Sequence, residues 1–262
     1  MKVLDLFSGI GGFSIGLERA GMHTVGFCEI DPYCREVLAK HWPGVPIHGD
    51  IRTLSGTKAD VICGGFPCQD ISIAGDGAGL AGVRSGLWSE YLRVIDETHP
   101  DWAVIENVGA LRSRGLDQVL RQLSEIGYDA ELYCIPAAAV GAPHRRDRVW
   151  IVAYPECELV WKQPGRRRGA DGAYQAFASV NGTPWLMADA DEPRLERWLR
   201  AELQECARQR ATGESGTSGI AGNWIAEPGI RRVADGVPNR SHRLRSLGNS
   251  IVPQIAEIIG RA

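Results

Sequence analysis

Residues 3–12 read VLDLFSGIGG: residues 3–7 form a mostly apolar run that predicts a short strand, and a loop rich in glycine follows it. After this loop, Phe13, Leu17 and Ala20 recur at helical spacing, and Gly21 is placed to end the helix. A strand that leads through a glycine loop into a helix is the opening unit of a doubly wound α/β sheet. The stretch therefore predicts that fold class.

The alternation of strands and helices continues to residue 154. Asp31 and Pro32 have the residue types of a helix N-cap and first helical position. Further strands are predicted at 24–29, 46–51, 60–63, 103–106, 128–135 and 148–153, and helices at 87–97 and 116–126. We therefore predict a doubly wound, mostly parallel, Rossmann-like sheet that binds ligands at the carboxyl ends of its strands.

Composition limits the classes of protein to consider. The chain has 262 residues, 44% hydrophobic and 23% charged, which suits one large α/β domain and a small, irregular second lobe. Its seven cysteines are odd in number and form no C-x-x-C pair, so we expect no metal and a reducing compartment. No apolar run approaches the roughly 20 residues that span a bilayer, and the start lacks a signal-peptide layout. We expect a cytoplasmic protein with no membrane partner.

Charge and regularity divide the chain into three regions. Residues 1–154 hold 14 Lys and Arg against 19 Asp and Glu, and carry the regular pattern. Residues 155–227 are less regular, with a predicted helix at 191–210, and residues 228–262 hold 6 Lys and Arg against 2 Asp and Glu. A basic end on an acidic body is compatible with a polyanionic partner, although arginine-rich faces are more often merely solvated.

One cysteine stands out as a candidate nucleophile. Cys68 follows the apolar run 61–63 and lies in the turn Gly-Gly-Phe-Pro of residues 64–67. A thiol at the carboxyl end of a buried strand can act as a nucleophile, or it can be a buried structural cysteine. The motifs Glu-Asn-Val at 106–108 and Arg-Asp-Arg at 146–148 favour the nucleophile.

The glycine loop is a candidate binding turn, because its glycines let the backbone approach a ligand. It lacks the pattern of a phosphate loop. Glu29 ends the second predicted strand, where such folds place an acid for ribose hydroxyls, and Asp50 ends the third. This pair suits an adenosine-bearing ligand without a pyrophosphate, while solvated acids are the alternative.

Together these motifs resemble the cytosine-C5 DNA methyltransferases of bacteria and phages. The ordered series is DLFSGIGGF (5–13), EID (29–31), GDI (49–51), GFPCQ (65–69), ENV (106–108), RRDRV (145–149) and GNSIVPQ (248–254). The resemblance implies a methyltransferase-type Rossmann-like fold and the cofactor S-adenosyl-L-methionine, released as S-adenosyl-L-homocysteine. It also implies methylation of C5 of a flipped-out cytosine in a specific double-stranded DNA sequence, through a covalent adduct between Cys68 and C6. Such enzymes serve restriction-modification or phage DNA protection.

The resemblance also assigns roles to individual residues. Cys68 would be the nucleophile, Glu106 would face the ring nitrogen of the base, and Arg146 and Arg148 would support it. Phe7 would stack on adenine, and Asn249 would close the pocket at the methionine end. The implied cofactor contacts are Phe7, Ser8, Gly9, Gly11, Gly12, Glu29, Ile30, Asp50, Ile51, Leu87, Asn249 and Ser250. The implied DNA contacts are Gln69, Ser72, Arg84, Arg231, Arg232 and Arg240.

Some features depart from the family pattern. His144 stands where many members have Gln before the arginine pair, and Ile71 stands where many members have Phe after the Cys-Gln pair. The target-recognition region, residues 155–227, is short for the family. The same chemistry on tRNA and a non-catalytic DNA-binding relic stay open as alternatives. A nicotinamide oxidoreductase fits the glycine loop but leaves Cys68 and Glu106 unexplained. We expect a monomer. A restriction endonuclease of the same system is a further candidate partner, with which no stable complex is expected.

Overall fold

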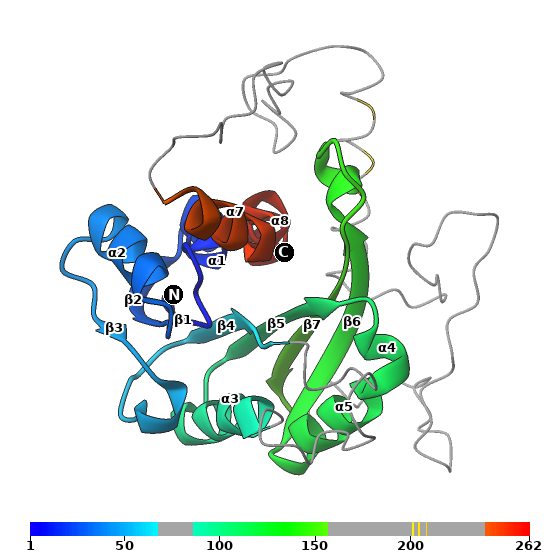
Figure 1. Ribbon diagram of the computed structural model, residues 1–262. Helices are drawn as coiled ribbons and strands as arrows, with labels where there is room; N and C mark the ends of the chain where they lie inside the picture. Colours follow the sequence, from blue (N-terminus) through cyan, green and yellow to red (C-terminus); the bar gives the residue numbers. More distant parts are fainter. Residues whose placement is uncertain (68–85, 157–200, 202–203, 205–207, 209–238) are drawn as a thin grey trace, which may run out of the picture.

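The computed structural model describes residues 1–67, 86–156, 201, 204, 208 and 239–262. Within this part of the chain, seven strands form one sheet in the order β3-β2-β1-β4-β5-β7-β6 (Figure 1). The strands are β1 (Lys2–Leu6), β2 (His23–Cys28), β3 (Ile47–His48), β4 (Val61–Gly65), β5 (Trp102–Val108), β6 (Tyr128–Pro136) and β7 (Asp147–Pro155).

Most strand pairs are parallel, as the sequence predicts. The pairs from β3 across to β5 are all parallel, whereas β7 runs antiparallel to both β5 and β6. The segment between β6 and β7 is too short for the crossover that parallel neighbours need, so these two strands form a hairpin. This hairpin brings residues 144–148 to the same edge of the sheet as the end of β5.

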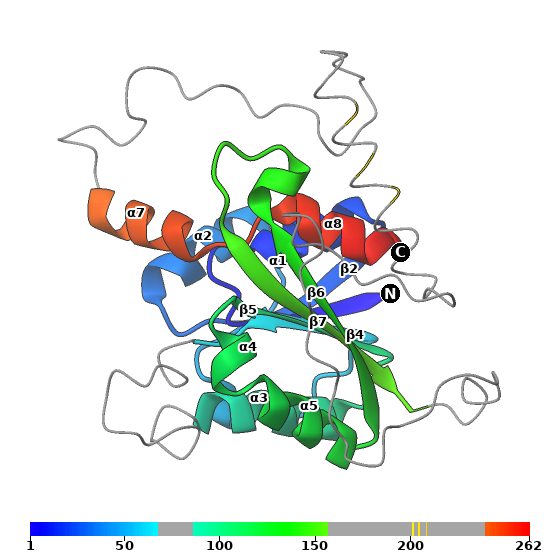
Figure 2. The same ribbon diagram turned by 90° about the vertical axis from the view of Figure 1, so that its right-hand side faces the viewer.

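Helices cover both faces of the sheet (Figures 1 and 2). They are α1 (Gly12–Arg19), α2 (Pro32–His41), α3 (Gly86–Thr98), α4 (Leu111–Arg114), α5 (Leu116–Glu125), α7 (Arg240–Asn249) and α8 (Pro253–Arg261), with short 3-10 helices η1 (Ile51–Thr53) and η4 (Ala137–Val140). Helices α1, α7 and α8 lie over one face, and α3 and α5 over the other. The two chain ends thus meet on one side, where α8 packs against α1.

Alternating strand residues fill two separate cores. Leu4 and Leu6 of β1 join a cluster with α3 and α5, whereas Val3 joins a cluster with α1 and α8. A strand that is buried on both faces consists mostly of consecutive apolar residues, and for this reason the sequence predicts β1 and β4. The rigid sheet fixes the strand ends where the candidate residues lie.

Three local features differ from the sequence prediction. Phe7 lies outside β1, because its backbone turns into the left-handed region at φ +51°. Asp50 does not end a strand, because β3 stops at His48 and the Asp50 side chain caps η1 by accepting from the Arg52 N–H at 3.0 Å. Helices α4, η4 and α7 were not anticipated.

Other predictions agree with the structure or fall outside it. The Asp31 carboxylate caps α2 by accepting from the N–H groups of Tyr33 and Cys34, and Pro32 is its first residue. Apart from residues 155, 156, 201, 204 and 208, the region 155–227 and its predicted helix lie outside the described residues. Among the helices that are described, none has the length and apolar character needed to cross a lipid bilayer.

Candidate active site

The glycine loop is held in a compact turn at the end of β1. The Ser8 hydroxyl donates to the Asp5 carbonyl at 2.6 Å, and the Gly11 N–H donates to the Ser8 carbonyl at 2.8 Å. Gly11 adopts φ +85°, and a Cβ there would lie 2.5 Å from the Trp42 ring, so a side chain is excluded on both counts. In contrast, a Cβ at Gly9 would meet no atom of the described residues within 4 Å. The loop therefore leaves open space in front of Gly9.

Glu29 connects this loop to the start of α2. One carboxylate oxygen accepts from the Gly9 N–H at 2.7 Å, and the other accepts from the Asp31 N–H at 2.7 Å. Each oxygen keeps acceptor capacity for a hydroxyl group. Ile30, beside it, is 69% exposed, and the half-buried ring of Phe7 meets Tyr91 edge-on at 6.0 Å. These residues fit an adenosine: an acid for the ribose, and two apolar side chains for the base.

Asp50 and Ile51 lie on the next turn. The Asp50 carboxylate pairs with the Arg52 guanidinium at 2.6 Å, and hydrogen bonds from Arg52 lower the pKa of Asp50 below its usual value. Asp50 consequently remains ionised near neutral pH and can only accept hydrogen bonds. The side chain of Ile51 is buried in the core beneath this turn.

Glu106 is the buried acid of the site. It lies on β5 opposite Gly65 of β4, and only 11% of its side chain is exposed. A Cβ at Gly65 would lie 2.7 Å from the Glu106 Oε2, so the absence of a side chain at Gly65 makes room for the carboxylate. Burial raises the pKa of Glu106 above its ordinary value, although the charges of Arg148 and Arg146 oppose this rise.

Arg148 supplies the partner of this acid. Its Nε lies 2.8 Å from the Glu106 Oε1, and it sits on β7 opposite Val108 of β5. The antiparallel register thus sets the Glu106–Arg148 contact. A single fixed guanidinium of this kind can orient a carboxyl group and present further donors to a ligand.

Asn107 holds the turn that leads to the candidate nucleophile. Its buried side chain donates to the Phe66 carbonyl at 3.1 Å and accepts from the Val108 N–H at 2.8 Å. The turn of residues 64–67 is thereby fixed beside Glu106. Sequence reasoning quoted Asn107 in its motif but gave it no role. Cys68, Gln69, Ser72 and Arg84 lie outside the described residues.

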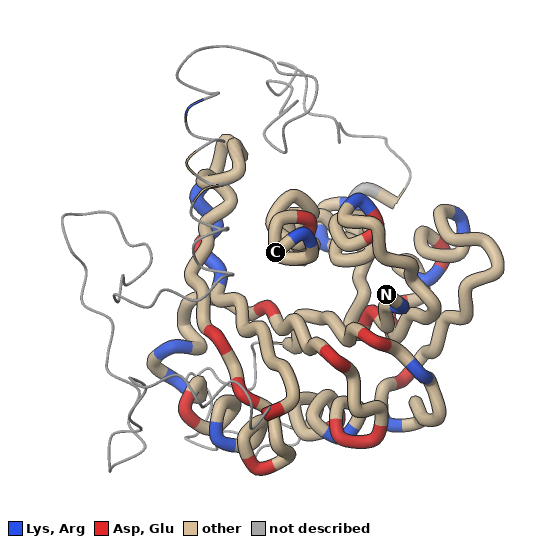
Figure 3. The backbone as a smooth tube through the Cα atoms, turned by 180° about the vertical axis from the view of Figure 1, so that it is seen from behind, with Lys and Arg blue, Asp and Glu red and all other residues tan. Residues whose placement is uncertain are grey.

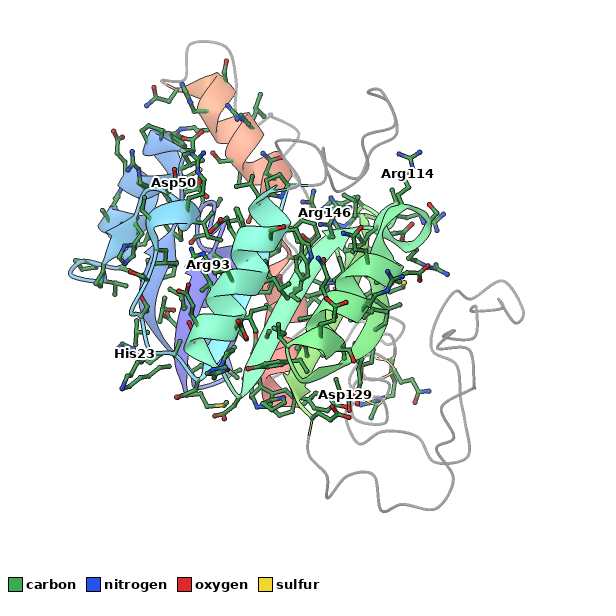
Figure 4. All side chains as sticks on the ribbon, turned by 90° about the horizontal axis from the view of Figure 1, so that it is seen from below. His23, Asp50, Arg93, Arg114, Asp129 and Arg146 are labelled. Carbon is green, nitrogen blue, oxygen red and sulfur yellow. The ribbon has the colours of Figure 1, made fainter. Side chains whose placement is uncertain are left out.

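Arg146 links the β6–β7 hairpin to the C-terminal segment. Its guanidinium donates to the carbonyls of Gly248 at 2.8 Å and Ser250 at 2.7 Å. Its backbone is in the left-handed region at φ +41°, a conformation that costs a non-glycine residue about 1–3 kcal/mol. Figure 3 shows closely spaced basic and acidic positions on this hairpin, and Figure 4 labels Arg146. Arg146 therefore contacts the C-terminal turn, whereas Arg148 contacts Glu106.

The remaining predicted residues lie around the same edge or outside the description. Ser250 approaches the start of α1, because a Cβ at Gly12 would lie 2.8 Å from its hydroxyl. Asn249 is the exposed last residue of α7, and Leu87 is half-buried on α3. The backbone of Arg240 begins α7, but its side chain, Arg231 and Arg232 are not described.

Comparison with known proteins identifies the family of the chain. A family model described as C-5 cytosine-specific DNA methylase matches residues 1–169 of the chain. The chain belongs to this family. The matched residues include Glu106, Arg146 and Arg148, and the segment that contains Cys68.

Individual members of the C-5 cytosine-specific DNA methylase family match the same part of the chain. Type II methyltransferase M2.BsuMI of Bacillus subtilis is 40% identical over 162 residues, which are 58% of this chain and 42% of that protein. Type II methyltransferase M.NgoFVII of Neisseria gonorrhoeae is 33% identical over 160 residues, 58% of this chain and 43% of that protein. The chain thus spans less than half the length of these relatives.

A solved structure shares the fold. A candidate DNA modification methyltransferase encoded within an E. coli prophage aligns over 100% of this chain and 97% of its own, with a TM-score of 0.59 and 18% sequence identity. At this level of identity the likeness concerns the fold alone. It agrees with the mostly parallel sheet predicted from the sequence.

Proposed function

We propose that this chain is a DNA (cytosine-5-)-methyltransferase that uses S-adenosyl-L-methionine. One observation carries the proposal: the buried Glu106, paired with Arg148, lies beside the turn of residues 64–67 that leads directly to Cys68. Membership of the C-5 cytosine-specific DNA methylase family supports the same activity.

The residues around the glycine loop would hold the cofactor. Glu29 would accept from the ribose hydroxyls, Asp50 from the adenine amino group, and Phe7 and Ile30 would flank the base. The open space at Gly9 and the exposed side chain of Ile30 support this assignment. Ser8, Gly11, Gly12, Ile51, Leu87, Asn249 and Ser250 complete the proposed contacts. When bound, S-adenosyl-L-methionine supplies an electrophilic methyl group on a sulfonium.

The target base needs activation, because C5 of cytosine is a poor nucleophile. The Cys68 thiolate would add to C6, which saturates the 5,6 double bond and places electron density on C5. Glu106 would donate a hydrogen bond to N3 as charge develops there, and its raised pKa favours the protonated form that can donate. General acid catalysis of this kind contributes roughly 10²–10⁴-fold.

Arg148 would assist the addition of Cys68 to C6 by contacting a second edge of the base. With its Nε on Glu106, the rest of its guanidinium is placed to donate toward the O2 edge of the base. After methyl transfer, loss of the C5 proton and expulsion of the thiolate restore the aromatic ring and free Cys68. These atoms are inaccessible in stacked DNA, so the cytosine must rotate out of the duplex.

Three consecutive regions of the chain would have different roles. Residues 1–154 would form the catalytic domain, 155–227 the target-recognition region, and 228–262 a segment that returns to the catalytic domain. The contact of Arg146 with Gly248 and Ser250 supports that return. DNA contacts are proposed for Gln69, Ser72, Arg84, Arg231, Arg232 and Arg240. We propose a cytoplasmic monomer that acts in restriction-modification or in phage DNA protection.

Expression of the chain in a bacterial host that lacks cytosine methylation tests the function. Bisulfite sequencing of the host DNA is expected to reveal 5-methylcytosine within one short sequence context, and sequencing of host tRNA is expected to reveal none. The Glu106→Gln variant is the matched control, and we expect it to leave the DNA almost unmodified. New methylation confined to tRNA, or none in either nucleic acid, would refute the proposal.

A further inference from the structure

The guanidinium of Arg93 on α3 joins this helix to the turn that contains Asp50 and Ile51. Its Nη2 donates to the Ile51 carbonyl at 2.8 Å, and both Nη1 and Nη2 donate to the Leu54 carbonyl at 3.2 Å. Figure 4 labels Arg93 on α3 and Asp50 on the neighbouring turn. One side chain thus fixes two main-chain carbonyls, one at each end of η1.

Two acids hold the guanidinium in this orientation. The Nε of Arg93 lies 2.7 Å from the Glu90 Oε2, and its Nη1 lies 2.8 Å from the Glu97 Oε2. The two acids are three residues before and four residues after Arg93, so all three side chains share one face of α3. A planar fork can span two carbonyls and two carboxylates at once, whereas a lysine ammonium cannot.

The turn is also held by its own residues: the Thr53 hydroxyl donates to the Asp50 carbonyl at 3.0 Å, and the Leu54 N–H donates to the Ile51 carbonyl at 3.2 Å. The side chains of Ile51 and Leu54 are buried in the core and anchor the turn there. The Asp50 carboxylate is partly exposed, and among the described residues its hydrogen bonds come from Arg52, two residues further along the chain. The carbonyl contacts made by Arg93 add to these local bonds and join the turn of Asp50 and Ile51 to α3.

We propose that Arg93 is a positioning residue that sets the selectivity of the cofactor site for adenine. The inference rests on the proposed function, in which Asp50 and Ile51 face the edge of the adenine ring. By fixing the carbonyls of Ile51 and Leu54, Arg93 holds the Asp50 carboxylate and the Ile51 N–H at the spacing that the amino group and N1 of adenine require. Hypoxanthine has an oxygen in place of that amino group and a hydrogen on N1, so the same turn rejects it.

Isothermal titration of the full-length chain with two ligands tests this role. S-adenosyl-L-homocysteine and S-inosyl-L-homocysteine differ only in the base edge that the turn faces. For the wild-type chain we expect the adenine ligand to bind about 10- to 100-fold more tightly, which is the value of one hydrogen bond that involves a charged group. In the Arg93→Met variant this ratio is expected to fall at least fivefold, with an intermediate ratio for Arg93→Lys.

The control is Glu97→Gln, which removes one exposed ion pair of Arg93 but neither carbonyl contact. It is expected to keep the wild-type ratio. We also expect kcat at saturating S-adenosyl-L-methionine to stay within about twofold in Arg93→Lys, because the groups that act on the base are unchanged.

Equal weakening of both ligands, with the ratio preserved, would show that Arg93 is merely structural and would overturn the inference. A wild-type ratio near one would overturn it as well. If Arg93→Met does not fold, the ratio in Arg93→Lys decides the matter in the same way. Failure of the wild-type chain to bind S-adenosyl-L-homocysteine would instead contradict the proposed function, so the two failures are distinguishable.

Discussion

Replacement of Gly65 by alanine probes the placement of Glu106 without removing any functional group. A Cβ at this position would lie 2.7 Å from the Glu106 Oε2, whereas ordinary contacts begin at 3.4 Å. The carboxylate would have to retreat by about 0.7 Å, the difference between these distances. Because the other oxygen of this carboxylate, Oε1, lies 2.8 Å from the Arg148 Nε, a displacement of that size disturbs this hydrogen bond.

The cost follows from the contact that is disturbed. A hydrogen bond to a charged group such as the Arg148 guanidinium contributes about 1.5–3 kcal/mol, so we expect kcat to fall by about 10- to 100-fold in Gly65→Ala. The assay is transfer of a tritiated methyl group to DNA that carries the target found by bisulfite sequencing. Thermal unfolding should change little, because the atom in the way is the end of a side chain.

Gly109→Ala is the matched control for this substitution. Gly109 follows β5 directly, and a Cβ there would meet no atom within 4 Å. It is expected to retain wild-type kcat. An unchanged kcat in Gly65→Ala would refute the reasoning that Gly65 makes room for Glu106, and an equal loss in Gly109→Ala would show that the effect is not specific.

Three further predictions address the surrounding residues. Arg148→Met removes the charge that opposes the effect of burial, so the pKa of Glu106 should rise further and kcat should fall about 10²-fold or more across the pH profile; an unaltered profile would contradict this. Arg146→Met removes two hydrogen bonds to the C-terminal turn, so it should lower the free energy of unfolding by about 2–4 kcal/mol in urea titrations. A loss below about 0.5 kcal/mol would argue against a stabilising contact between Arg146 and this turn. Burial raises the pKa of Asp5 to about 8, so the folded chain binds the extra proton between roughly pH 4 and 8. The free energy of unfolding should therefore fall with rising pH, by about 1.4 kcal/mol per unit across that window, and Asp5→Asn should remove this slope.

The sequence predicted those parts of the fold that depend on local pattern. Buried parallel strands such as β1 and β4 appear in the sequence as apolar runs. The family resemblance implied that Arg146 and Arg148 support Glu106 or its base, and in the structure Arg148 contacts Glu106. The end of β3 was misjudged, because an apolar residue at Ile51 follows the strand but belongs to η1. Helix α7 was missed, because among its described side chains only Ser246 is buried and no apolar repeat marks it.

Contacts between distant segments were beyond the reach of sequence pattern. Arg146 donates to the backbone carbonyls of residues that lie 102 and 104 positions further along the chain. Every residue type has a backbone carbonyl, so the sequence cannot indicate which one accepts. The contacts of Arg93 with Ile51 and Leu54 have the same character. In both cases the sequence gives the position of the arginine but not of its partner, which is a main-chain group.

The covalent step is tested most directly with DNA duplexes that carry 5-fluorocytosine between randomised flanking bases. Fluorine at C5 cannot leave as a proton does, so an enzyme of the proposed mechanism stays attached to the base after methyl transfer. In the presence of S-adenosyl-L-methionine, mass spectrometry of the digested complex should find the modified nucleotide on the peptide that contains Cys68, and Cys68→Ala should give no complex. A chain that methylates DNA yet never becomes attached, or that attaches through another residue, would contradict the account.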